Sequence, residues 1–154
     1  MPMQLEINGR RYEVDVPPLK PLARVLREDL GLMGTKIGCY EGRCGSCNVL
    51  VDGLVVASCL FPLGLAEGTA IRTVEGLGEE GALAPLQEAI LSHGGVQCGI
   101  CTPGILMTLT ALLERSPSPA EQEVREALVG NLCRCTGYHK IVGAVLAVAA
   151  GRPA

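Results

Sequence analysis

The sequence is poor in aromatic residues and carries no excess of positive charge. Its 154 residues include no Trp, one Phe and three Tyr, and the formal net charge is −3. Cores must therefore be built from aliphatic side chains, which are plentiful because hydrophobic residues make up 48% of the chain. No basic run is present, and aromatic residues do not interleave with basic ones, although proteins that neutralise phosphates and stack bases need such features. We expect no nucleic-acid partner.

Long apolar runs and a secretion signal are also missing. Every apolar stretch is interrupted by Gly, Thr or a charge before it reaches the roughly 18 residues of a membrane span. The first residues show no charged segment followed by an apolar one, so we expect no signal peptide, no membrane span and a cytoplasmic location. In that compartment the eight cysteines are expected to be metal ligands, with disulfide bonds as the alternative.

The first four cysteines follow a spacing that is typical of iron–sulfur proteins. Three of them have C-x4-C-x2-C spacing and a fourth follows downstream: Cys39, Cys44, Cys47 and Cys59. This is the plant-type ferredoxin pattern for a 2Fe–2S cluster. Gly38, Gly42 and Gly45 lie between or beside these cysteines, where a cluster loop needs positive φ angles or a close backbone approach, so that inward N–H groups form a nest for anionic sulfur. A structural zinc site is the alternative, although zinc ligands usually come as two short C-x2-C knuckles.

The other four cysteines form a second quartet in the C-terminal half. They are Cys98, Cys101, Cys133 and Cys135, at C-x2-C and C-x-C spacing. This combination is common neither in zinc sites nor in ferredoxins, so the spacing alone leaves zinc and an iron–sulfur cluster both open. The two quartets together use every cysteine in the chain. Two clusters in one small chain would mean that electrons pass through it.

The N-terminal half is patterned as a small mixed sheet with one helix. Two segments alternate apolar and polar residues around a tight-turn pair, Asn8-Gly9 in one and Asp52-Gly53 in the other, which predicts two hairpins. Residues 21–30 have helical spacing, and 71–74 predict one more strand. We therefore predict an α+β domain over residues 1–77.

The pattern changes after Gly76, where several glycines and the acidic pair Glu79-Glu80 indicate a linker. Beyond it the alternation stops, and four segments have the apolar spacing of helices. They are 83–93, 102–113, 118–128 and 138–149, with Thr102 and Ser118 as predicted N-terminal caps. The cysteines of the second quartet precede the second and fourth helices, where the helix dipole favours thiolate charge. We predict an all-α four-helix bundle over residues 78–154.

Several longer motifs occur in order along the chain and extend beyond the cysteines. They are GTKIGC at 34–39, CGSC at 44–47, SC at 58–59, TVEGL at 73–77, QCGICTPG at 97–104 and GNLCRCTGY at 130–138. With these motifs the whole chain resembles the small iron–sulfur subunit of the molybdenum hydroxylases. That family includes xanthine and aldehyde oxidoreductases, aerobic carbon monoxide dehydrogenase and N-heterocycle hydroxylases. No predicted cluster ligand departs from the family pattern.

The resemblance implies a fold, cofactors and partners. The N-terminal domain would be a plant-ferredoxin-like β-grasp, and each quartet would hold a 2Fe–2S cluster. Electrons would pass from the molybdenum cofactor of a large subunit through the second and then the first cluster to FAD on a medium subunit or to another acceptor. The three chains would form a heterotrimer, and a dimer of heterotrimers is common in the family. Gln97 would place its amide against the pterin of the molybdenum cofactor, and Cys135 would link the second cluster toward that pterin.

Nothing in the sequence predicts substrate chemistry in this chain. The two histidines lack a neighbouring carboxylate or nucleophile, so His93 is expected to cap a helix end and His139 to be solvated or interfacial. Arg43 and Arg134 lie inside the cluster motifs, where tuning of the cluster potential and plain exposure on a loop are both open. We expect no turnover by the isolated chain. A free-standing electron carrier and a zinc-stapled structural module are the competing functions.

Overall fold

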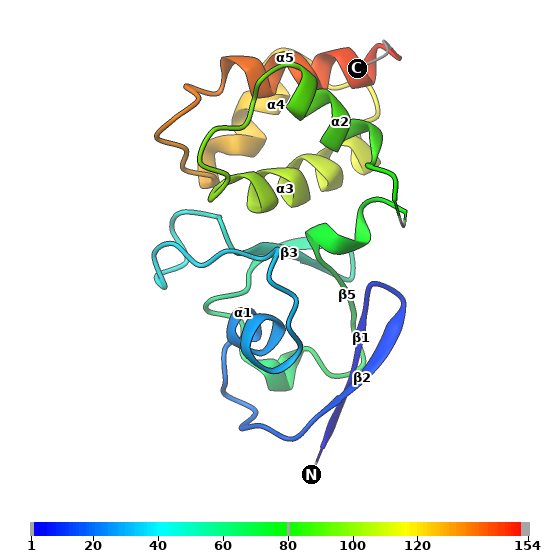
Figure 1. Ribbon diagram of the computed structural model, residues 1–154, viewed down its shortest axis with the longest axis vertical. Coiled ribbons are helices and arrows are strands. Elements are labelled where there is room, and N and C mark those ends of the chain that lie inside the picture. Colours follow the sequence, from blue (N-terminus) through cyan, green and yellow to red (C-terminus); the bar gives the residue numbers. More distant parts are fainter. Residues whose placement is uncertain (1, 80, 152–154) are drawn as a thin grey trace.

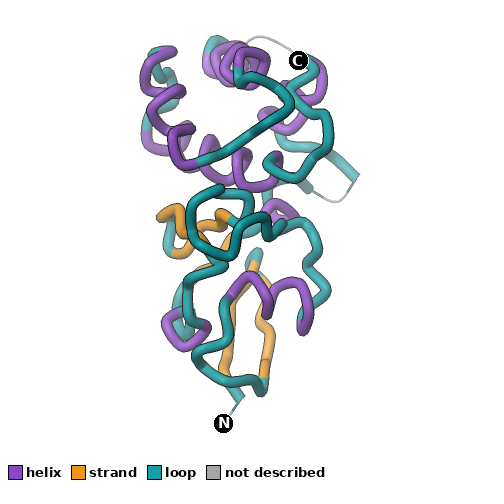
Figure 2. Tube along the Cα trace, turned by 90° about the vertical axis from the view of Figure 1, so that its left-hand side faces the viewer, coloured by secondary structure: helices purple, strands orange, loops and turns teal. Residues whose placement is uncertain are grey.

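Strands occupy one end of the molecule and the longer helices the other, with the N-terminus at the strand end and the C-terminus at the helical end (Figure 1). The computed structural model describes residues 2–79 and 81–151. The view turned by 90° shows the same division, with the orange strands and a few short purple helical segments below the longer helices (Figure 2). This division matches the two predicted halves.

The strand end is built on one five-stranded mixed sheet. Its strands are β1 (Met3–Ile7), β2 (Arg10–Val14), β3 (Asn48–Val51), β4 (Leu54–Ala57) and β5 (Ala70–Arg72). They lie in the order β2-β1-β5-β3-β4, with β1 and β5 parallel and the other pairs antiparallel. Both predicted hairpins are confirmed, because Asn8 and Asp52 have φ angles of 52° and 50°, as a tight two-residue turn requires.

The predicted helix at 21–30 packs on this sheet but is not a continuous α-helix. It begins as α1 (Leu22–Arg24) and continues as a π-helical turn, Val25–Asp29, in which the Leu30 N–H donates to the Val25 carbonyl at 3.1 Å. The buried side chains of Leu22 and Leu26 join the aliphatic core of the sheet. One helix across a mixed sheet is the predicted β-grasp arrangement, which is confirmed.

The last strand is shorter than predicted. We expected it at 71–74, but β5 ends at Arg72 and a 3-10 turn, Val74–Gly76, follows. The reason lies at Thr73, whose N–H donates to the Asn8 side-chain oxygen at 2.9 Å while its hydroxyl accepts from the Asn8 amide at 3.0 Å. These bonds to the first hairpin take Thr73 out of the ladder.

Four helices form the other end, as predicted. They are α2 (Pro85–Ser92), α3 (Thr102–Arg115), α4 (Glu121–Ala127) and α5 (His139–Ala149), and a 3-10 turn, Leu128–Gly130, extends α4. Their core is aliphatic apart from Cys101, Cys133 and Tyr138, as the scarcity of aromatic residues requires. The imidazole of His93 lies 2.8 Å from the Ala89 carbonyl, so the predicted cap at the end of α2 is confirmed.

Both predicted N-terminal caps are wrong. Thr102 is already helical, because the Cys101 carbonyl accepts the first helical bond from Ile105 at 3.0 Å. The next helix begins at Glu121 rather than near Ser118, with Ala120 at its cap. The carboxylate of Glu123 accepts the Ala120 N–H at 2.7 Å and so satisfies the helix start without a capping hydroxyl.

The two halves meet where α3 lies on the sheet. The buried Asn48 amide on β3 donates to the Thr108 hydroxyl on α3 at 3.1 Å. Half-buried Val74 and Leu77 pack against the helical core, so the connector belongs to the contact between the halves. The boundary between 77 and 78 and the linker stay predictions, and Glu80 lies outside the described residues. None of the helices within the described ranges has the length and apolar character that a bilayer crossing needs.

Candidate metal centres

The first quartet sits at the sheet end that faces the helices. Three of its cysteines lie in the loop that leads into β3, and Cys59 follows the end of β4. Cys47 and Cys59 are buried, whereas Cys39 and Cys44 are partly exposed. Figure 1 shows this loop in cyan beside the lower end of the helical half. The site thus has a dry inner pair and a solvent-facing outer pair.

Backbone N–H groups converge on the outer pair. The N–H groups of Glu41 and Cys44 donate to the Cys39 sulfur at 3.3 and 3.4 Å. Together with the N–H of Arg43, they lower the pKa of Cys39 to about 6. Burial has the opposite effect on Cys59 and raises its pKa to about 11. The loop therefore favours negative charge on sulfur at its outer side, as an anionic cluster requires.

The three glycines named from the sequence lie where the loop is tight. Gly42 and Gly45 both have φ angles of +69°, in the region that favours glycine. A Cβ atom at Gly38 would lie 3.1 Å from the Cys44 sulfur, and one at Gly45 would overlap the carbonyl oxygen of Gly130. Gly45 is thus in backbone contact with the helical half.

The second quartet is assembled from two corners of the helical half. Cys98 and Cys101 lie between α2 and α3, and Cys133 and Cys135 lie between the end of α4 and α5. Cys101 is buried, which raises its pKa to about 12, whereas Cys98 and Cys135 are exposed. Burial acts to raise the pKa of Cys133, but hydrogen bonds from Thr136, Cys101 and Cys135 together leave that pKa lowered.

The thiols of each quartet lie near one another. The sulfur atoms of Cys98 and Cys135 are 3.6 Å apart. The neighbouring thiols of Cys133 and Cys47 help to raise the pKa of Cys101 and of Cys59, respectively. Within residues 2–79 and 81–151, no three or more His, Cys, Asp or Glu side chains gather closely enough to hold a single metal ion. Each quartet supplies the four thiols that one 2Fe–2S cluster needs.

The remaining predicted site residues lie at the surface. Gln97 is exposed, and its amide donates to the Cys135 carbonyl at 3.0 Å, so these two residues stand together. Arg43 is 81% exposed and reaches only Glu41, at 3.7 Å. Arg134 and His139 are exposed as well.

Backbone contacts join the two quartets. The Leu132 N–H donates to the Cys44 carbonyl at 2.9 Å, and the Asn131 amide donates to the Gly45 carbonyl at 3.2 Å. Sequence analysis gave no role in the sites to Asn131, Thr136 or Tyr138, although the motif at 130–138 contains all three. Their signal is a polar or aromatic side chain close to Cys133 and Cys135, and the bond from Asn131 to Gly45 joins residues that are far apart in sequence.

Comparisons with known proteins identify both halves. Residues 5–71 match the family model for a 2Fe-2S iron-sulfur cluster binding domain, and residues 73–146 match the model for a [2Fe-2S] binding domain. The chain is 54% identical over 144 residues to the nicotine 6-hydroxylase small subunit of Paenarthrobacter nicotinovorans, covering 94% of this chain and 87% of that relative. It is 46% identical over 143 residues to the nicotinate dehydrogenase small FeS subunit of Eubacterium barkeri, covering 93% and 91%.

A solved structure gives the same result. The fold superposes with a TM-score of 0.94 on a chain of quinoline 2-oxidoreductase from Pseudomonas putida 86, at 47% identity, covering 97% of this chain and 92% of that one. A coverage of 97% of this chain takes in both halves. The chain belongs to the small iron–sulfur subunits of the molybdenum hydroxylases of the xanthine dehydrogenase family.

Proposed function

We propose that this electron-transfer subunit of an oxidoreductase holds one 2Fe–2S cluster on each cysteine quartet. The ligands would be Cys39, Cys44, Cys47 and Cys59 for one cluster and Cys98, Cys101, Cys133 and Cys135 for the other. When bound, such a cluster accepts and releases single electrons. The observation that carries the proposal is that each quartet lies inside a domain that matches a 2Fe-2S family model, with the sulfur atoms of Cys98 and Cys135 3.6 Å apart.

The protein around each quartet would hold charge and exclude water. Buried Cys47, Cys59 and Cys101 close the inner side of the sites, and N–H groups stabilise thiolate charge at Cys39. Gly38, Gly42 and Gly45 would let the loop backbone approach the cluster. The inner and outer sides differ in solvation, which influences reduction potential. The boundary between the two proposed cluster-binding domains would lie between residues 77 and 78.

The partners we propose are a large molybdenum-binding chain and a medium FAD-binding chain in a heterotrimer. Electrons would enter at the second quartet and leave from the first toward FAD. In support, Gln97 and Cys135 are exposed and joined by a hydrogen bond, so both are available to a pterin on another chain. The use of all cysteines as ligands also supports a cytoplasmic location, where thiols stay reduced.

Metal analysis of the purified complex tests the ligand assignment. We expect about four irons per chain, no stoichiometric zinc, and visible absorbance that is lost when iron is removed. Zinc, or about two irons, would refute the assignment of two clusters. Size-exclusion chromatography of the native material tests the partners separately. The subunit should elute with larger chains that contain molybdenum and flavin, whereas a free-standing carrier elutes alone.

A further inference from the structure

Residues 131–133 touch both cysteine loops at once. Leu132 donates its N–H to the carbonyl of Cys44, and the next residue in the chain is Cys133. One hydrogen bond of 2.9 Å therefore completes an otherwise covalent connection from a thiol of the first quartet to a thiol of the second. No other backbone hydrogen bond between the described residues joins two ligand-bearing loops so directly.

The side chain of Asn131 adds a second hydrogen bond between the two loops, although its burial is energetically costly. Its side chain is 1% exposed, and its oxygen Oδ1 has no hydrogen-bond partner among the described residues. A buried polar atom without a partner is destabilising, so an apolar residue would suit the packing better. What the amide does make is the bond from Nδ2 to the Gly45 carbonyl at 3.2 Å. The side chain is therefore placed to hold the two loops together.

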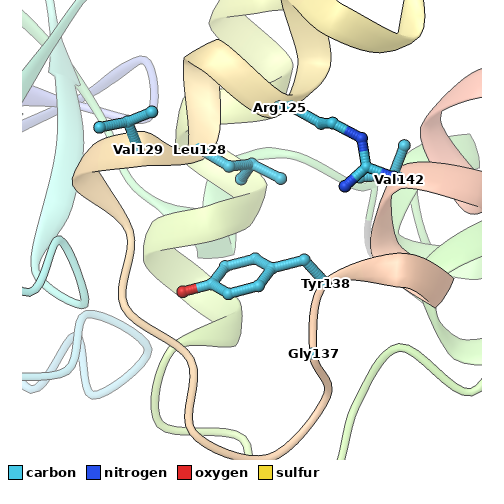
Figure 3. A pocket seen from close by; sticks show the side chains of 6 residues that line it. All are labelled: Arg125, Leu128, Val129, Gly137, Tyr138 and Val142. Carbon is cyan, nitrogen blue, oxygen red and sulfur yellow. The ribbon is translucent and has the colours of Figure 1, made fainter.

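The hydroxyl of Tyr138 holds this segment in place from the other side. It donates to the Asn131 carbonyl at 2.8 Å and accepts the Cys133 N–H at 2.7 Å, so it brackets Leu132. Figure 3 shows the ring lining a cavity of about 290 Å³ beneath Leu128, with its hydroxyl directed at the chain that follows Val129. Tyr138 has a φ angle of 65°, which is uncommon for a bulky residue. Its backbone conformation aims the ring at this segment.

We propose that Tyr138 is a positioning residue for electron transfer between the two quartets. Through its hydroxyl it holds residues 131–133 against the backbone of Cys44 and Gly45, and so it fixes the distance and the bonded contact between the centres. This inference rests on the proposed function, because it assumes that both quartets carry clusters. The step itself moves one electron, so that one centre is oxidised as the other is reduced.

The test is the substitution Tyr138→Phe in the full chain, purified with the chains that accompany it. Phenylalanine keeps the ring and removes both hydrogen bonds, which corresponds to roughly a tenfold or larger shift toward a released segment. We expect about four irons per chain, as in the wild type. Electron paramagnetic resonance of the dithionite-reduced protein should show an altered magnetic splitting between the two centres. Electron exchange between the two centres can be followed after pulse radiolysis. It should slow by roughly tenfold, because loss of the two hydrogen bonds releases the segment from the backbone of Cys44.

Tyr12→Phe is the matched control, because Tyr12 is half-buried on β2 and its hydroxyl makes no hydrogen bond to the described residues. It should leave both readouts unchanged. Wild-type splitting and exchange in Tyr138→Phe at full iron content would overturn the inference. If Tyr138→Phe loads less iron, both readouts are taken on the fraction that keeps about four irons per chain. Altered splitting in that fraction supports the inference, and wild-type splitting overturns it. A wild type without four irons would instead refute the ligand assignment.

Discussion

The first quartet takes three of its four cysteines from one nine-residue loop, whereas the second takes two from each of two corners separated by more than thirty residues. The main core of the sheet end contains none of these cysteines, because Cys47 and Cys59 pack with Ala23 in a small separate cluster. The main core of the helical end, in contrast, includes Cys101 and has Cys133 packed against it. From this difference we expect the sheet end to depend less on its metal centre for folding than the helical end does.

The largest expected difference between the two ends follows from removing one ligand from each. Cys101→Ser should reduce iron from about four to about two per chain and lower the free energy of unfolding by more than about 4 kcal/mol, because metal binding and folding are coupled in the helical core. Cys44→Ser should lose as much iron but keep the sheet and most of the stability. Iron analysis and thermal melting followed by circular dichroism check both. Equal losses of stability would contradict the comparison.

The second largest loss of stability is expected from a substitution at the contact between the sheet end and the helical end. A Cβ atom at Gly104, in the first turn of α3, would overlap the carbonyl oxygen of Gly45. Gly104→Ala should therefore push α3 away from the first cysteine loop and destabilise the protein by about 3 kcal/mol, as overpacking does. The control is Gly143→Ala in α5, where the nearest atom, on His93, is 4.0 Å away. Denaturant unfolding should show Gly143→Ala to be neutral or more stable by about 0.5–1 kcal/mol, since alanine is the better helix former.

Sequence patterns predicted features that depend on neighbouring residues. The turn pairs Asn8-Gly9 and Asp52-Gly53 specify their hairpins locally, and the spacing of Cys39 to Cys47 indicates a cluster loop by itself. Helix periodicity located all four helices of the bundle, and the resemblance supplied the family, which the comparisons confirm.

The mispredicted strand end depends on a contact between distant residues, because the strand ends at Arg72 where Thr73 bonds to Asn8. The helix cap at Ala120 is local, but it uses the Glu123 carboxylate in place of the predicted Ser118 hydroxyl. The link from Leu132 to Cys44 crosses between the two ends and leaves no trace in either spacing pattern. The role of Tyr138 depends on this link, because its hydroxyl bonds to the residues on either side of Leu132.

The contact between the sheet end and the helical end also contains a buried hydrogen bond, from Asn48 on β3 to Thr108 on α3. Thr108→Val should leave the Asn48 amide without its acceptor between β3 and α3, which should cost about 1–3 kcal/mol. Thr110→Val, two residues along the same helix, is the control and should change the free energy of unfolding by less than about 0.5 kcal/mol. Urea titration of both variants measures the difference. A similar small effect of both would show that the Asn48–Thr108 bond does not hold the two ends together.

The smallest expected effect on stability comes from Gln97→Ala, although it bears on the partner chain. The lost bond to the Cys135 carbonyl is exposed, so the free energy of unfolding should change by less than about 1 kcal/mol and iron should stay at about four per chain. Molybdenum content of the purified complex should fall, because the amide is proposed to contact the pterin. Gln4→Ala is the control, since it removes another exposed amide that bonds to Glu13 at the far end of the sheet. If molybdenum is retained equally in both variants, Gln97 serves only to brace Cys135, and the second centre faces its partner without that contact.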